Sequence, residues 1–249
     1  LDLNELAIKR GVTAIVDAGL APGIPNFLLG YHDVKGEIDS FEYYVGGLPK
    51  NPKPPFNYKA PFSPVDVIEE YIRPARMKVN GKRITRSALS EIENINFENV
   101  GTLEAFNTDG LRSILVTMDH INNMKEKTLR YPGHAALMAN YRNAGKFDKE
   151  RIRKTSDELF RAWRLEKNEP ELTIMKIIIK IERSKIEYNL YDEFDVKTGF
   201  SSMSRTTGFT ATATVNMVAL NLFNECGVFP PELVGKKLNC TEYLIDYLF

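Results

Sequence analysis

The sequence is poor in cysteine and has no excess of charge of either sign. Its 249 residues include two cysteines, Cys226 and Cys240, which lack CxxC spacing and nearby histidine partners. Two cysteines in a chain of this length do not form a disulfide framework, so we expect a reducing, cytoplasmic setting. The 33 basic residues equal the 33 acidic ones. A net charge of zero gives no electrostatic reason to expect nucleic acid or an anionic membrane as a partner.

Long apolar runs, signal patterns and internal repeats are missing as well. No apolar run approaches the ~20 residues that cross a bilayer, and the N-terminus lacks a basic segment followed by an apolar one. We therefore expect a soluble protein with no membrane partner. No spacing of His, Cys, Asp and Glu residues indicates a metal site, so we expect no metal. The length allows one large domain or two small ones.

The glycine pattern G-x-G-x-x-G is also missing, although the first residues resemble half of a βαβ unit. Residues 1–10 have the apolar spacing of a helix, Gly11 follows as at a helix end, and residues 12–16 form a short β-branched run. A phosphate-binding glycine turn is expected upstream of such a helix. The pattern favours either a fragment of a longer protein or a helix and strand with no nucleotide role.

A turn rich in glycine and proline follows this predicted strand. It reads Asp17-Ala-Gly-Leu-Ala-Pro-Gly-Ile-Pro-Asn26 and indicates a buried strand that ends abruptly before a helix. In open α/β folds, ligands lie at that end of the strand. We therefore expect a ligand at this turn.

The middle of the chain predicts helices and hairpins in irregular alternation, which favours a mixed or largely antiparallel sheet with helices. Asn80-Gly81 predicts a tight hairpin, and Gly46-Gly47 should end the strand before it. A long hairpin at 172–190 would leave an open edge, and its burial in a homodimer is expected. The expected strands are 41–45, 101–106, 125–129, 172–182 and 186–190, and the expected helices are 24–31, 64–72, 111–117, 132–143, 148–165 and 209–223.

Two arginines flank a proline in the segment Glu70-Tyr-Ile-Arg-Pro-Ala-Arg76. The planar fork of Arg73 or Arg76 suits capture of a carboxylate or phosphate. Arginines at the end of a helix are also ordinary partners of the helix dipole. The residues alone leave both interpretations open.

The segment Gly101-Thr-Leu-Glu-Ala-Phe-Asn-Thr-Asp-Gly110 places Thr108 and Asp109 ahead of a predicted helix. Asp109 as a helix N-cap would contribute about 1 kcal/mol. A role at a substrate is an equal alternative.

The segment Lys127-Thr-Leu-Arg-Tyr-Pro-Gly-His-Ala135 has the most suggestive chemistry. His134 falls in the first turn of a predicted helix, where the positive end of the dipole favours a neutral imidazole. Beside Arg130 and Tyr131 it could orient an amine or take a proton. The competing interpretation is a capping or core histidine.

The segment Ser204-Arg-Thr-Thr-Gly-Phe-Thr210 begins the last long predicted helix with hydroxyls and exposed N–H groups. Arg205 and Thr206 could form an anion site there. A simple capped helix is the alternative.

Five separated motifs, in order from about 12 to 223, resemble the saccharopine dehydrogenase and lysine 6-dehydrogenase family. The turn at 17–23 is similar to D-C-G-x-A-P-G, with Ala18 in place of Cys, and the other four are similar to E-Y-T-R-P-A-R, G-T-L-E-A-F-x-T-D-G-L-R, T-L-R-Y-P-G-H and R-T-T-G-Y/F-T. Ile72 stands where the second motif has Thr. The resemblance is closer to the lysine 6-dehydrogenase branch.

The resemblance implies an NAD- or NADP-dependent oxidoreductase that acts on an amino acid, of which this chain is the C-terminal part. It implies an α/β (α+β) fold: a mixed, largely antiparallel sheet with helices, flanked by terminal remnants of a Rossmann-type nucleotide-binding domain. Residues 1–30 would end that domain, 31–200 would bind substrate and dimerise, and 201–249 would return to it. A non-catalytic ligand-binding or dimerisation module and a dehydrogenase for another diamine or amino acid are the alternatives.

The resemblance also implies roles for residues. His134 or Asp109 would lie near the amine as catalytic groups, and Arg130 or Arg73 would hold a carboxylate. The remaining expected substrate-binding residues are Arg76, Thr108, Tyr131, Arg205 and Thr206, and the expected cofactor-binding residues are Asp17, Ala18, Gly19, Pro22 and Gly23.

Overall fold

The computed structural model describes residues 2–182 and 184–248. No helix in these ranges is long and apolar enough to cross a membrane. The helices are α1 (Asn4–Arg10), α2 (Ile24–Asp33), α3 (Pro64–Ile72), α4 (Ile114–Thr117), α5 (His134–Asn143), α6 (Ile152–Ala162), α7 (Ser202–Ala219), α8 (Pro231–Gly235) and α9 (Leu238–Leu248). The strands are β1 (Thr13–Ile15), β2 (Ile38–Pro49), β3 (Ala75–Val79), β4 (Lys82–Arg86), β5 (Glu93–Phe97), β6 (Gly101–Asn107), β7 (Asn123–Arg130), β8 (Glu171–Ile181), β9 (Ser184–Glu193) and β10 (Gly227–Phe229).

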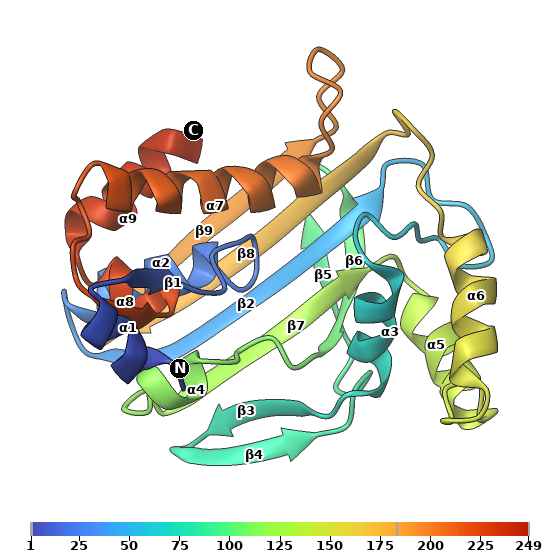
Figure 1. Cartoon of the computed structure of the whole chain (residues 1–249). Helices are drawn as coiled ribbons and strands as arrows, with labels where there is room; N and C mark the ends of the chain where they lie inside the picture. The colour runs from blue at the N-terminus through green and yellow to red at the C-terminus, as the bar shows by residue number, and fades with distance from the viewer. Residues whose placement is uncertain (1, 183, 249) are drawn as a thin grey trace.

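An open eight-stranded sheet forms the frame of the molecule (Figure 1). Six strands follow the order β4-β3-β7-β2-β8-β9, and β6 joins the sheet beside the second half of β7 with β5 at its side. Among the described strands of this sheet, β2 and β7 pair in parallel and the other pairs are antiparallel. The expected mixed, largely antiparallel sheet is confirmed.

A second, two-stranded sheet brings the two ends of the chain together. β1 pairs in parallel with β10, from Thr13 opposite Gly227 to Ile15 opposite Phe229. Gly11 ends α1 in the left-handed conformation, as a glycine after a helix permits. The helix and strand expected at residues 1–16 are confirmed, whereas β10, α8 and α9 had no clear signal in the sequence.

Two apolar layers hold the helices to the main sheet. On one face, α2 and α4 pack against β2 and β8 through a core that includes Leu28, Ile114, Phe41 and Ile177. α7 and α9 lie together beside them (Figure 1). The helices α3, α5 and α6 gather at one end of the sheet around the fully buried Trp163.

Short-range turn chemistry explains the smaller connections. Asn80 and Gly81 have φ of 50° and 76°, which is the tight turn between β3 and β4 that the Asn-Gly pair predicts. The connection from 50 to 63 is irregular apart from an isolated bridge, as its prolines require.

The strand β2 corrects one prediction, because it does not end at Gly46-Gly47. It continues to Pro49 in register with β8, and its inner positions are buried on both faces. A side chain at Gly46 would lie 2.8 Å from the Leu129 backbone oxygen, and one at Gly47 would lie 2.5 Å from Met203. These glycines let neighbouring residues approach both faces of β2 closely, and they do not end the strand.

Two helix starts also differ from the predictions. α4 begins at Ile114, so Asp109 is not its N-cap. α7 begins at Ser202, where Ser201 accepts a hydrogen bond from the Ser204 N–H. The helix therefore starts about two turns before Phe209, and Arg205 and Thr206 lie within it.

Candidate functional site

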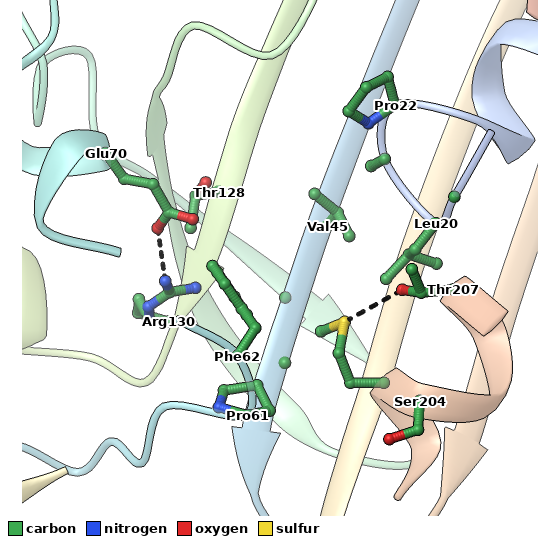
Figure 2. Close-up of a pocket in the computed structure, with 15 residues that line it drawn as sticks. Leu20, Pro22, Val45, Pro61, Phe62, Glu70, Thr128, Arg130, Ser204 and Thr207 are labelled. Carbon is green, nitrogen blue, oxygen red and sulfur yellow. Dashed lines mark hydrogen bonds and ion pairs between the residues drawn. The ribbon is translucent and has the colours of Figure 1, made fainter. Parts of the chain in front are cut away.

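A cleft of about 480 Å³ opens where the turn after β1 meets the main sheet (Figure 2). Residues 19–22 form one wall, and residues 45–47 of β2 with Thr128 and Arg130 of β7 form the floor. The first turns of α7 and the proline-rich connection complete it with Met203, Ser204, Thr207, Pro61 and Phe62. The lining is mostly apolar, with the Glu70 and Arg130 side chains at one end (Figure 2).

A smaller pocket of about 130 Å³ continues this cleft toward the loop after β6. The two cavities share Ala21, Val45, Glu70 and Thr128. Five carboxyl side chains and one guanidinium line the smaller cavity, which we call the acidic pocket: Asp66, Glu69, Glu70, Asp109, Glu126 and Arg73. This set of charges favours a cation as the ligand of the acidic pocket.

The turn at 17–23 takes its shape from close backbone contacts. The Gly19 N–H donates to the Pro22 carbonyl oxygen at 3.0 Å. A side chain at Gly23, whose φ is 143°, would lie 1.8 Å from the Gly19 oxygen, so only glycine fits there. Gly19 and Pro22 line the cleft, whereas Ala18 and Gly23 do not. Asp17 lies on the outer side of the turn and pairs with Arg112 at 3.1 Å.

Arg130 is almost fully buried, with 2% of its surface exposed. Its Nη2 donates to Glu70 Oε2 at 2.6 Å, its Nη1 donates to the Leu129 carbonyl, and its guanidinium lies 4.4 Å from the Tyr58 ring centre. The buried Nε has no partner among the described residues. Burial raises the pKa of the Glu70 carboxyl, and the Arg130 charge opposes that rise.

Arg73 is the more accessible of the two candidate carboxylate clamps. Its side chain is 50% exposed and makes an i,i+4 pair with Glu69 at 3.1 Å. It borders both the acidic pocket and a neighbouring surface cavity with Arg76 and Arg112. Such an exposed pair is weak, so a ligand carboxylate could replace Glu69 as the partner of Arg73.

His134 lies within the aromatic cluster under α3, α5 and α6, and does not line the cleft or the acidic pocket. Its Nδ1 donates to the Phe56 carbonyl at 2.8 Å, and its Nε2 accepts from the Tyr71 hydroxyl at 2.9 Å. Burial, followed by the Arg130 charge, lowers the pKa of His134 to about 3. The imidazole is therefore neutral, as expected, although burial rather than the helix dipole is the main cause.

A buried carboxylate, Glu104, explains why α5 begins at His134. Its two oxygens accept the backbone N–H groups of Gly133 and Ala135 at 3.0 and 2.5 Å. This interaction satisfies donors at the helix N-terminus from a neighbouring strand. The sequence did not single out Glu104, although it lies inside the T-L-E-A-F motif.

Asp109 pairs with Arg76 and does not cap a helix. Arg76 donates through Nε and Nη2 to both Asp109 oxygens at 2.8–3.1 Å, and its backbone N–H adds a further bond at 3.0 Å. The carboxylate is only 6% exposed yet borders the acidic pocket. The structure thus brings these two predicted residues together as a bidentate pair.

Glu126 is a buried carboxyl group of this site that sequence reasoning missed. Its Oε2 accepts from the Thr108 hydroxyl at 2.6 Å and from the Gly110 N–H at 3.0 Å, and Thr108 also contacts the Thr128 hydroxyl at 2.9 Å. Burial is the main cause that raises the pKa of Glu126 to about 8. Glu126 lies two residues before the T-L-R-Y-P-G-H motif, inside a strand whose polar residues gave no sign that they would be buried.

Three further predicted residues, Tyr131, Arg205 and Thr206, line neither the cleft nor the acidic pocket. The Tyr131 hydroxyl donates to the Pro49 carbonyl at 2.9 Å, Arg205 pairs with Asp192 at 3.3 Å, and the Thr206 hydroxyl donates to the Ser202 carbonyl within α7. Ser204 and Thr207 line the cleft instead. Ser204 and Thr207 are three residues apart in α7 and therefore share the helix face that borders the cleft.

These residues could hold one end of a dinucleotide at most. The apolar cleft beside the Gly19 and Pro22 turn fits a planar ring, but no glycine pattern for phosphates occurs in the sequence. Within 2–182 and 184–248, no group of three or more His, Cys, Asp or Glu side chains could hold a metal ion.

Comparisons with known proteins agree with the motifs. The family described as the saccharopine dehydrogenase C-terminal domain matches residues 19–248. The solved structure of apo histidine-tagged saccharopine dehydrogenase (L-Glu forming) from Saccharomyces cerevisiae superposes with a TM-score of 0.77 at 17% identity. The match covers 98% of this chain and 74% of that one, and at this identity it shows the fold alone.

Curated relatives are larger than this chain. An alpha-aminoadipic semialdehyde synthase of Arabidopsis thaliana is 31% identical over 163 residues, which are 59% of this chain and 15% of that protein. The mitochondrial protein of that name from Rattus norvegicus is 27% identical over 162 residues, 60% of this chain and 18% of that protein. The chain thus spans less than a fifth of these relatives.

Proposed function

The chain belongs to the family of the saccharopine dehydrogenase C-terminal domain, and on this premise we propose that it is the substrate-binding and catalytic part of an NAD(P)-dependent oxidoreductase. In this proposal the enzyme oxidises a C–N bond of an amino acid by hydride transfer. The observation that carries the proposal is the apolar cleft that opens directly into a pocket lined by five carboxyl groups.

Each part of this cavity suits one part of such a reaction. Gly19 and Pro22 would border the nicotinamide ring of NAD or NADP, which when bound supplies the hydride acceptor. The carboxyl groups of the acidic pocket would attract the substrate ammonium, and Asp109 is the predicted group among them. Arg73 would bind the substrate carboxylate from the pocket rim.

Arg130 and His134 have supporting roles in this proposal. Arg130 already has a carboxylate partner, because its Nη2 lies 2.6 Å from Glu70 Oε2. It would therefore hold Glu70 in place at one end of the cleft, and its own contact with the substrate would be peripheral. His134 would hold the buried Tyr71 side chain in place through their hydrogen bond and would not touch the substrate. Both stay candidate site residues, together with Thr108, Arg76 and the turn at 17–23.

An assay of the protein as its gene encodes it tests the proposal. Reduction of NAD and of NADP is measured with lysine, saccharopine and a panel of diamines and amino acids. Arg73→Ala should raise KM at least tenfold with little change in kcat, and Arg83→Ala, which removes an exposed arginine paired with Asp119, should change neither. No reduction with any compound would favour the non-catalytic module, and a preferred diamine would favour the related dehydrogenase.

We also propose a homodimer through β9, the end strand of the main sheet. This strand carries charged side chains of both signs, among them Lys185 and Glu187. Two copies of a strand can pair antiparallel and cover each other's edge. Light scattering in solution should give twice the 28.3 kDa chain mass, and a mass of one chain would contradict this. A cytoplasmic location stays a prediction.

A further inference from the structure

Glu126 differs from the other buried glutamates of this molecule. Glu104, Glu171 and Glu232 each accept hydrogen bonds on both carboxylate oxygens. The two hydrogen bonds to Glu126 both end on Oε2, and Oε1 accepts none from the described residues. Fully paired carboxylates have a sufficient structural explanation, whereas Glu126 keeps one oxygen for another partner.

The unpaired oxygen belongs to a side chain that borders a cavity. Glu126 is 4% exposed and lines the acidic pocket, while Glu104, Glu171 and Glu232 line neither that pocket nor the cleft. Gly110 makes room for it, because a side chain at Gly110 would lie 2.6 Å from the Glu126 carboxyl carbon. Thr108 and the Gly110 N–H hold Oε2 in place and so orient the carboxyl group.

The charges around Glu126 make proton exchange possible near neutral pH. Asp66, Glu69 and Glu70 face the pocket from α3, Arg73 faces it from the residue after that helix, and Asp109 faces it from the loop after β6. From β2, the Tyr43 hydroxyl donates to the Gly110 carbonyl. Burial and the neighbouring carboxylates raise the pKa of Glu126 to about 8, a value suited to a group that takes and gives protons.

We propose that Glu126 takes the proton that the substrate ammonium loses before hydride transfer, with Oε1 as the accepting atom. This inference rests on the proposed function. Glu126 would be a catalytic residue, and Thr108 would be a positioning residue that acts through Oε2.

The step balances with a nicotinamide dinucleotide as the oxidant. An N–H bond of the substrate ammonium breaks, and its proton forms an O–H bond with Glu126. The amine lone pair then forms the C=N bond as the adjacent carbon loses hydride to the oxidised nicotinamide. The substrate is oxidised to an iminium, the nicotinamide is reduced, and the proton on Glu126 leaves to water.

A binding experiment tests the contact without catalysis. Affinities of L-lysine and L-norleucine, which lacks the side-chain amine, are measured by calorimetry between pH 6.5 and 8.5 on the protein as its gene encodes it. The ratio of lysine to norleucine affinity should rise about tenfold over this range, because ionised Glu126 attracts the ammonium. In Glu126→Gln, which keeps an acceptor for Thr108 and Gly110, the ratio should stay flat.

Two further measurements separate the inference from the proposed function. The ascending limb of the pH–rate profile should disappear in Glu126→Gln and persist in Glu98→Gln, which changes an exposed carboxyl outside the cavity. A carboxyl NMR titration of the wild-type protein should show that bound lysine lowers the pKa of Glu126. This measurement does not depend on whether the Glu126→Gln variant folds. Activity with a flat affinity ratio, or a Glu126 titration unmoved by lysine, would overturn the inference. An inactive enzyme whose affinity ratio still rises tenfold would overturn the proposed function, and with it the catalytic role of Glu126, but not the contact between Glu126 and the ammonium.

Discussion

The buried histidine of the R-Y-P-G-H segment shows how much one residue's meaning depends on its surroundings. The sequence left His134 open as an amine ligand, a base or a core residue. The structure gives it two hydrogen-bond partners, Phe56 and Tyr71, and 1% exposure. A neutral imidazole was predictable from its place at a helix start, but its burial was not, because the aromatic residues around it come from distant parts of the chain.

His134 should remain neutral down to acidic pH. Its pKa of about 3 lies below the ordinary 6.5, so between these values the unfolded chain binds more protons than the folded one. The free energy of unfolding should therefore fall by up to about 1.4 kcal/mol per pH unit as pH drops below 6.5. Proton NMR should show no titration of the His134 ring from pH 8 to pH 5. A midpoint near 6.5 would contradict the burial.

The pair of Glu70 and Arg130 should matter for stability as well as for the cleft. Glu70→Gln leaves the Arg130 charge buried without its anion, and we expect a loss of about 3 kcal/mol in the free energy of unfolding. The adjacent change Glu69→Gln removes a pair whose side chains are 39% and 50% exposed, so its loss should be below about 1 kcal/mol. Urea denaturation of both variants measures the two losses in the free energy of unfolding. Equal losses would show that the buried pair contributes no more to stability than the exposed one.

At the scale of elements, short-range signals were the most reliable. The Asn80-Gly81 hairpin and the helix from Pro64 to Ile72 follow the prediction closely. The prediction failed where distant packing decided the outcome. Gly46 and Gly47 continue β2 because Leu129 and Met203 approach them, and these contacts cannot be read from the local sequence. The turn at 17–23 could be recognised from its own glycines and prolines. Glu126 could not be recognised, because its burial depends on contacts with residues that are distant in the sequence.

The crossing of α2 and α8 should be unusually sensitive to volume. A side chain at Gly30 would lie 2.0 Å from the Glu232 carbonyl oxygen, so Gly30→Ala should cost about 1–3 kcal/mol. Gly208 in α7 has no atom within 4 Å of the equivalent position, and Gly208→Ala should stabilise by about 0.5–1 kcal/mol. Thermal unfolding of the two variants measures both signs. A tolerated Gly30→Ala would mean that the helices can separate.

At the scale of the whole molecule, the first and last strands of the chain form one unit beside the cleft. β1 and β10 pair with each other, and the turn after β1 contributes a wall of the cleft. A parallel sheet of two short strands is too small to be stable alone. The family resemblance predicted that the first and last parts pack together, although the boundaries at 30 and 200 stay predictions.

This chain by itself should bind NAD and NADP weakly. Its sequence has no glycine-rich phosphate turn, so a dinucleotide would contact it mainly through the nicotinamide end. Calorimetry with either nucleotide should give a Kd above roughly 1 mM, because the sequence lacks the glycine-rich turn that binds the pyrophosphate at such sites. Micromolar binding would show that another part of this chain holds the phosphates.

The most direct measurement of the central claim maps the substrate onto the cavity. Methyl-labelled protein is titrated with lysine, saccharopine and related amino acids and followed by NMR. We predict saturable shifts of Ala21, Val45 and Thr128, which line both the cleft and the acidic pocket. The methyl groups of Ile24 and Ile245, in the apolar pocket between α2 and α9, should not move. Unchanged cleft methyls with every amino acid, or shifts confined to that apolar pocket, would contradict the account.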